Sequence, residues 1–187
     1  MALLDRLNEW QSKRLHITKF DNLNNRFSDE FLHQVIEVLT DKVVADLPPS
    51  WHGIKTTEQA KNWLNQQSQE GTLYLMTLNE DGSDTIGEQL VGFLVLYESM
   101  EKGMGSRVHL GYAIAEIYWG KGLATEVLNA LVSSLSTLKV ELTLLAGVAE
   151  KNLASRRVLE KAGFQQVEGN PQEVNLFYSL SISTNGN

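Results

Sequence analysis

Three strand patterns follow one another in the middle of the chain, with no helical pattern between them. Residues 72–78 carry the first, and residues 90–97 are almost wholly apolar, as is typical of a strand covered on both faces. Residues 107–115 alternate between two faces. Because helical patterns lie before and after this block, the chain is restricted to a mixed α/β fold, one sheet with helices packed on its faces.

Further elements extend this arrangement on both sides. Apolar stripes and capping residues predict helices over 29–42, after Thr56, over 123–138 and over 152–163. Strand patterns at 14–20, 140–148, 164–168 and 174–182 bring the sheet to about seven strands, and Asp81-Gly82 predicts a turn. We expect a single domain over 1–187, with its core at 14–183, an N-terminal extension at 1–13 and a free tail at 184–187.

Composition excludes several classes of protein. With 42% hydrophobic and 21% charged residues, the chain can bury one core and is not disordered. Its 16 basic and 23 acidic residues give a net charge of −7, which argues against nucleic-acid or anionic-membrane binding and suits a cationic partner.

The chain contains no cysteine, which excludes disulfides, a cysteine nucleophile and thiolate metal sites. Its four histidines lack metal-ligand spacing, so no metal is expected. The opening MALLDRLNEW is no signal peptide, and no stretch approaches 18 apolar residues. We therefore expect a soluble, cytoplasmic protein.

A glycine-containing turn joins the strand at 107–115 to the helix after it. Trp119 is followed by Gly120, Lys121 and Gly122, and the helix begins at Leu123-Ala124-Thr125. Glycines let several backbone N–H groups point one way, and the helix start adds positive potential, so the segment suits a phosphate or pyrophosphate. It is neither a P-loop nor a dinucleotide fingerprint, and a strand-to-helix turn without a ligand remains an alternative.

The helix near the C-terminus has clear end signals. Asn152 is a good N-cap and Gly163 a good C-terminal stop, so Asn152 and Ser155 taken alone are read as capping residues.

Together, the turn at Trp119–Thr125 and the segment Asn152–Phe164 resemble the GNAT acetyltransferase superfamily, which transfers an acetyl group from acetyl-CoA to an amine. GYAIAEIYWGKGLATEVLNAL and NLASRRVLEKAGF look most like the Rim-type ribosomal-protein N-terminal acetyltransferases, whereas residues 1–70 match weakly. The resemblance implies a mainly antiparallel sheet that splays near the cofactor. It also implies that acetyl-CoA contacts Ala113, Ile114, Ala115, Trp119, Gly120, Lys121, Gly122, Leu123, Ala124, Thr125 and Asn152.

The sequence departs from the family pattern at two places. Trp119 stands where the loop often begins with Gln or Arg, a feature familiar in the Rim-type branch. Leu159 stands where many members carry a tyrosine that protonates the leaving thiolate, and Ser155, one turn earlier, is the candidate acid. A serine near a helix start can also be simply a local cap.

The resemblance makes His109 the candidate general base. It shares a strand face with Gly111 and Ala113, whose small size leaves a groove, although a histidine packed on the sheet is the alternative. An α-amine with a pKa of about 7.7–8.0 is roughly 10–20% neutral at pH 7, so an imidazole suffices as its base.

Trp51 and His52 lie in the loop that covers the acceptor site in the family, with an aromatic packing role as the alternative for Trp51. The expected function is acetylation of an N-terminal alanine or serine of a ribosomal protein, and a homodimer is plausible by resemblance. Acetylation of a small amine (a polyamine, amino acid or aminoglycoside) and a non-catalytic acyl-CoA sensor stay open.

Overall fold

The computed structural model describes residues 3–21, 27–79, 89–101, 105–168 and 175–183. The expected turn at Asp81-Gly82 and the tail at 184–187 lie outside these residues. Eight strands form one sheet in the order β1-β2-β3-β4-β5-β6-β8-β7, with all neighbours antiparallel except the parallel pair β5–β6. The strands are β1 Glu9–Gln11, β2 Leu15–Lys19, β3 Thr72–Leu78, β4 Leu90–Glu101, β5 Gly105–Ile114, β6 Leu142–Ala149, β7 Gln165–Val167 and β8 Asn175–Ile182.

The mixed, mainly antiparallel sheet is confirmed, with eight strands in place of about seven. The additional strand, β1, lies in the segment expected to be an N-terminal extension. Three residues are too few to show the alternation of a strand. Trp10 is buried, however, and its ring packs edge-on against that of Tyr74, with 4.8 Å between the ring centroids. This packing makes residues before 14 part of the sheet's edge.

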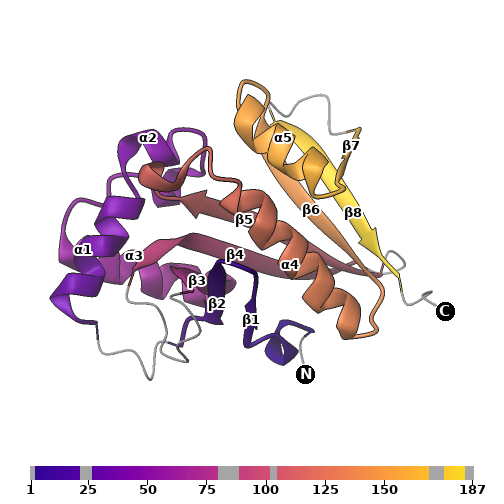
Figure 1. Cartoon of the computed structure of the whole chain (residues 1–187), viewed down its shortest axis with the longest axis horizontal. Coiled ribbons are helices and arrows are strands. Elements are labelled where there is room, and N and C mark those ends of the chain that lie inside the picture. Colours follow the sequence, from indigo (N-terminus) through magenta and orange to yellow (C-terminus); the bar gives the residue numbers. More distant parts are fainter. Residues whose placement is uncertain (1–2, 22–26, 80–88, 102–104, 169–174, 184–187) are drawn as a thin grey trace.

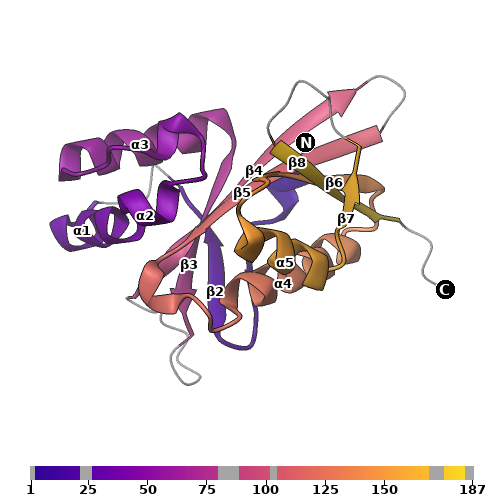
Figure 2. The ribbon, with the colours of Figure 1, turned by 90° about the horizontal axis from the view of Figure 1, so that it is seen from above.

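Helices cover both faces of the sheet. Helices α1 (Asp29–Val38), α2 (Asp41–Val44) and α3 (Thr57–Glu70) lie on one face, and α4 (Leu123–Thr137) and α5 (Leu153–Lys161) lie on the other (Figure 2). Short 3₁₀ turns occur at η1 (Leu3–Arg6), η2 (Pro49–Trp51) and η3 (Glu116–Tyr118).

The helix expected over 29–42 is in fact two helices. Thr40 has extended backbone angles and its side chain caps α2 by accepting from the Val43 N–H, so the chain starts afresh there. The capping box predicted at Thr56 and Gln59 is present at the start of α3.

Strands β5 and β6 pair over only four positions and then separate. Their register runs from Ser106 opposite Leu142 to His109 opposite Leu145, and no pairing follows. Figure 1 shows β6 and β8 turning away from β4 and β5, with α4 and α5 beside the opening. We call this opening the splay.

On its other edge β5 is held tightly against β4. A Cβ built at Gly92 would lie 2.1 Å from the Ala113 carbonyl oxygen, so only glycine fits there.

None of the helices in the described ranges is both long enough and apolar enough to span a membrane.

Candidate active site

Beyond His109, the edge of β5 that faces the splay is not paired with another strand. The Ala115 N–H donates to the Val91 carbonyl of β4 at 2.9 Å, which turns the backbone groups of Ala113 and Ala115 toward β4. Backbone direction alternates along a strand, so Tyr112 and Ile114 present theirs to the splay. Within the expected segment Ala113–Ala115, only Ile114 therefore presents its backbone groups to the splay, and Tyr112 is the next residue that does so.

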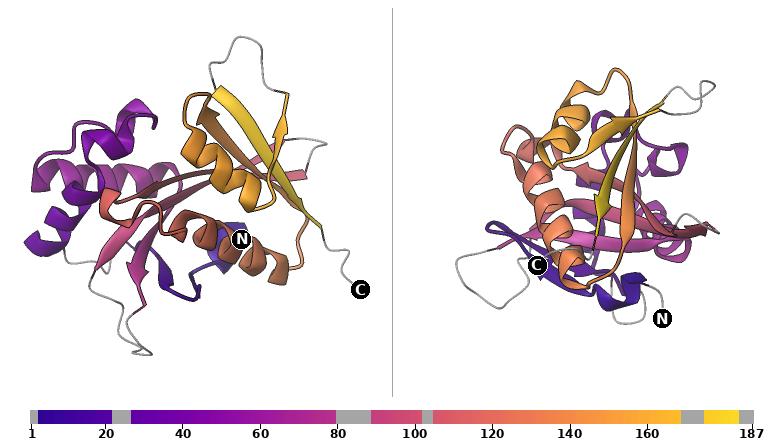
Figure 3. Two further views of the ribbon diagram at one scale, coloured as in Figure 1. Left: turned by 45° about the horizontal axis from the view of Figure 1, so that its top comes forward. Right: turned by 90° about the vertical axis from the view of Figure 1, so that its right-hand side faces the viewer.

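The glycine turn leads from this edge to the start of α4 (Figure 3). Gly120 and Gly122 have φ of 72° and 77°, a region that favours glycine. Gly122 is the N-cap of α4, and no side chain caps the helix start. The first N–H groups of this 15-residue helix are thus available to an anion.

One contact from a distant segment and one local hydrogen bond hold the residues before the turn. Lys42 of α2 forms an ion pair with Glu116 and lies 5.4 Å from the centre of the Trp119 ring. The indole N–H of Trp119 donates to the Ile114 carbonyl at 2.7 Å. Trp119 thereby occupies the carbonyl group of Ile114, the last residue of β5.

Glu126, in the first turn of α4, anchors the helix to the segment before β2. It accepts from the Ser12 hydroxyl at 2.7 Å and from the Arg14 backbone N–H at 2.8 Å, and Arg14 Nη2 lies 2.6 Å away. Burial raises the pKa of Glu126, but hydrogen bonds from Ser12 and Arg14 and the Arg14 charge outweigh it and leave the pKa lowered. Sequence patterns gave no signal for this network because Glu126 lies more than 100 residues from Ser12 and Arg14.

A pair of hydroxyl groups crosses the splay. Ser155 Oγ on α5 lies 2.7 Å from the Tyr112 hydroxyl oxygen on β5, and either can donate. The Ser155 N–H donates to the Asn152 side chain at 3.0 Å, so the predicted cap at Asn152 is present. Leu159, one turn further along α5, is fully buried.

Tyr112 was not among the residues singled out from the sequence. Alternation placed it with Val108, Leu110 and Ile114 as a core residue, and only its hydroxyl distinguished it. Burial raises the pKa of Tyr112 to about 12, and the hydrogen bond with Ser155 opposes this rise.

His109 occupies the last paired position of β5, where the splay opens. Its side chain is exposed, and it lies opposite Tyr97 of β4, whose hydroxyl donates to Gln67 of α3 at 2.9 Å. His109 therefore belongs to the α1–α3 face. Tyr112, three positions on, belongs to the α4–α5 face. The two candidate catalytic residues lie on opposite faces of the sheet, with the splay between them.

A sequence model described as "Acetyltransferase (GNAT) domain" matches residues 25–165, well over half of the chain. The chain belongs to the GNAT acetyltransferase family.

Relatives agree with this assignment. "Probable N-acetyltransferase YjcK" of Bacillus subtilis (strain 168) is 35% identical over 80 residues, which are 42% of this chain and 43% of that protein, so the match spans less than half of either.

Two solved structures show the same fold. A GNAT-family acetyltransferase from Bacillus anthracis has 22% identity and a TM-score of 0.65, covering 95% of this chain and 99% of the other. RimL, a ribosomal L7/L12 α-N-protein acetyltransferase in complex with coenzyme A, has 15% identity and a TM-score of 0.66, covering 93% and 97%. At these identities the likeness establishes the fold alone.

The two residues expected near the acceptor differ in environment. Trp51 of the GNAT domain is only 2% exposed, and its ring packs edge-on against Trp63 at 5.0 Å. This burial gives Trp51 a packing role. His52 is exposed, and its Nε2 lies 2.9 Å from the Leu47 carbonyl oxygen.

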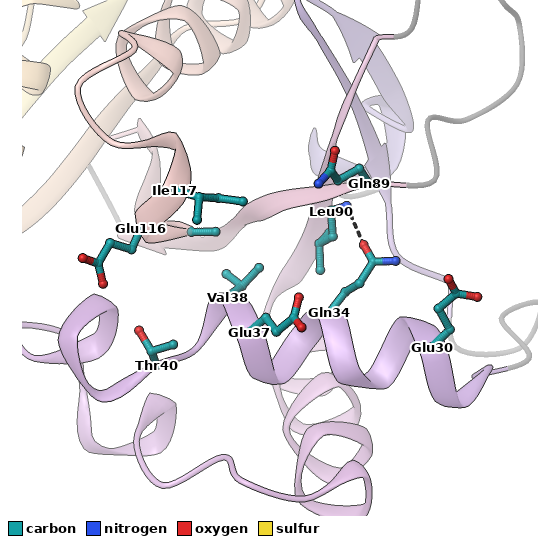
Figure 4. Close-up of a pocket in the computed structure, with 10 residues that line it drawn as sticks. Glu30, Gln34, Glu37, Val38, Thr40, Gln89, Leu90, Glu116 and Ile117 are labelled. Carbon is teal, nitrogen blue, oxygen red and sulfur yellow. Dashed lines mark hydrogen bonds between the residues drawn. The ribbon is translucent and has the colours of Figure 1, made fainter.

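A cavity of about 780 Å³ lies between α1 and the adjoining ends of β4 and β5 (Figure 4). Glu30, Glu37 and Glu116 line it, and Gln34 reaches from α1 to accept from the Leu90 N–H at 2.7 Å. Of the residues predicted for the site, only Ala115 contributes to the wall of the cavity.

Among the residues that the structure describes, no group of three or more His, Asp or Glu side chains could hold a metal ion.

Proposed function

We propose that this GNAT domain transfers the acetyl group of acetyl-CoA to an amine. The observation that carries this proposal is the splay, where the β5 edge without a partner strand leads to a helix start that no side chain caps. That combination suits a long molecule with amide groups at one end and phosphates at the other, as coenzyme A has. The RimL structure, which has the same fold, contains coenzyme A.

In this proposal, backbone N–H groups from Gly120 to Thr125 bind the pyrophosphate. The pantetheine arm lies along the β5 edge at Tyr112 and Ile114, which directs the thioester toward the vertex of the splay. The amine attacks the thioester carbon directly in a ternary complex. His109, or a water that it orients, accepts the amine proton, and Ser155 protonates the departing thiolate.

We further propose that the acceptor is the N-terminal alanine or serine of a ribosomal protein. An α-amine has a pKa of about 7.7–8.0, so an exposed histidine is a sufficient base, whereas a lysine amine at about 10.4 would be neutral far less often. The Rim-type resemblance of the two motifs supports the same class. Such an acceptor would place the enzyme in the cytoplasm.

The cavity favours a second candidate, a small polycationic amine. Glu30 and Glu37 are exposed carboxylates on one helix, and Glu116, which forms an ion pair with Lys42, lies at the other end of the cavity. Carboxylates on a concave surface attract amines with several positive charges. Replacing Glu37 with glutamine should then raise KM for spermidine and leave KM for a peptide unchanged.

A thiol-release assay with acetyl-CoA tests these functions. The acceptors are peptides beginning with alanine or serine, including ribosomal-protein N-termini, together with spermidine, free amino acids and an aminoglycoside. Because the chain has no cysteine, any free thiol comes from CoA. Release with a peptide supports the N-terminal acetyltransferase, and release with a small amine alone supports the second candidate. Binding of acetyl-CoA without release from any acceptor would contradict both and indicate a sensor.

A further inference from the structure

The hydrogen bond between Tyr112 and Ser155 joins two elements that the sheet itself leaves apart. Tyr112 lies three residues beyond the last position at which β5 pairs with β6. Ser155 lies on α5, which follows β6 in the chain. Their oxygen atoms are 2.7 Å apart, which is ideal for a hydrogen bond between hydroxyl groups. The pair therefore spans the opening through which the thioester would enter.

The chemistry of the pair sets the direction of this hydrogen bond. A phenol is a stronger acid than an aliphatic alcohol and is the better donor. Since the pKa of Tyr112 is raised to about 12 by burial, its hydroxyl keeps its proton at neutral pH. The Ser155 backbone is held by Asn152, so its hydroxyl can rotate only about its own side-chain bonds. When Tyr112 donates to Ser155 Oγ, the serine O–H is free for a further acceptor.

We infer that Tyr112 is a positioning residue for the acetyl transfer, holding Ser155 Oγ so that the serine O–H points at the thioester sulfur. This inference rests on the proposed function. When the tetrahedral intermediate collapses, the C–S bond breaks and its electron pair goes to sulfur. The Ser155 proton moves to sulfur and gives the CoA thiol. Ser155 Oγ takes the phenolic proton of Tyr112, and the phenolate regains a proton from water.

Ser155 is the only residue of α5 (Leu153–Lys161) that carries a hydroxyl group. Leu159 is apolar and fully buried. Tyr178 also contacts the helix, but its hydroxyl is engaged elsewhere: it donates to Glu160 at 3.2 Å and accepts from Arg156 at 3.2 Å. Tyr178→Phe is therefore a matched control, because it also removes a tyrosine hydroxyl that contacts α5.

The experiment compares Tyr112→Phe, Ser155→Ala, the double variant and Tyr178→Phe with the wild type, using the acceptor that gives the highest turnover. Initial rates give kcat and KM for acetyl-CoA, calorimetry gives its Kd, and thermal unfolding confirms folding. We expect Tyr112→Phe to lower kcat roughly tenfold to a hundredfold, with KM and Kd within twofold. The double variant should be no slower than Ser155→Ala alone, because the two hydroxyls act as one unit. Tyr178→Phe should keep wild-type kcat.

The outcomes separate this inference from the proposed function. Wild type without turnover on any acceptor overturns the proposed function and this inference with it. Turnover by wild type with an unchanged kcat in Tyr112→Phe overturns the inference alone. So do losses that multiply in the double variant. If Tyr112→Phe does not fold, Ser155→Thr, which keeps the hydroxyl, decides: kcat near wild type supports the pair, and kcat as low as in Ser155→Ala overturns it.

Discussion

Replacing Gly122 with glutamate tests whether the glycine turn binds the cofactor's phosphates. Gly122 is the N-cap of α4 and has a φ of 77°. A side chain there would start in nearly open space, since the atom nearest to its Cβ is Arg14 Nη2 at 3.9 Å. The substitution therefore adds two defined effects, backbone strain and a negative charge beside the helix start.

The size of each effect can be worked out separately. A non-glycine residue in this region costs roughly 1–2 kcal/mol of folding stability. Two unit charges about 4 Å apart interact by about 1 kcal/mol in water and about 4 kcal/mol near a protein surface. A middle value of about 2 kcal/mol against the pyrophosphate weakens acetyl-CoA binding roughly thirtyfold.

Calorimetry with acetyl-CoA measures the change in Kd. Two control variants separate the effect of the negative charge from the effect of backbone strain. Gly122→Gln has the strain without the charge, so it should weaken binding less than Gly122→Glu. Gly53→Glu has the charge and a similar strain, with φ of 75° and open space around its Cβ, at a position outside the turn. It should lower stability and leave Kd unchanged. An unaltered Kd in a folded Gly122→Glu variant would refute the assignment of the phosphate site.

Three further predictions concern catalysis and stability. Ser155→Ala should lower kcat by at least tenfold while leaving the Kd for acetyl-CoA within twofold, and an unchanged kcat would remove Ser155 from the mechanism. The lowered pKa of Glu126 means that its contribution to stability is present above its usual value of 4.5 and is lost as pH falls through the folded-state pKa; urea unfolding of Glu126→Gln at several pH values should show a weaker loss of stability on acidification than the wild type. Gly92→Ala should destabilise the fold by roughly 1–3 kcal/mol or more in urea unfolding, because its Cβ would meet a backbone carbonyl, whereas Gly111→Ala, with no atom within 4 Å of its Cβ, should be close to neutral.

The long elements were predictable because their signals are local. The strand at Thr72–Leu78 has the expected bounds, and the capping box at Thr56 starts a helix as predicted. The break at Thr40 was missed, since apolar spacing continues across it while the cap depends on one hydroxyl. Strand β1 was missed because its place in the sheet comes from the burial of Trp10 rather than from its own pattern.

In the candidate site, too, local features could be predicted from the sequence and long-range contacts could not. The turn at Gly120–Gly122 and the cap at Asn152 could be found because each is a contiguous motif. The contacts of Tyr112 with Ser155 and of Arg14 with Glu126 join segments 43 and 112 residues apart, and only the folded chain brings them together. A single sequence carries no record of such pairs.

The position of His109 and Ser155 on opposite faces of the sheet has a kinetic consequence. The acceptor and acetyl-CoA would arrive through separate entrances, so neither has to leave before the other can bind. Initial-rate plots at several fixed acceptor concentrations should then intersect, as in a sequential mechanism, and no acetylated form of the protein should accumulate. Desulfo-CoA should compete with acetyl-CoA and not with the amine. Because each substrate would have its own entrance, the relative affinities of acetyl-CoA and the amine, and not access to the site, would then determine which of them binds first.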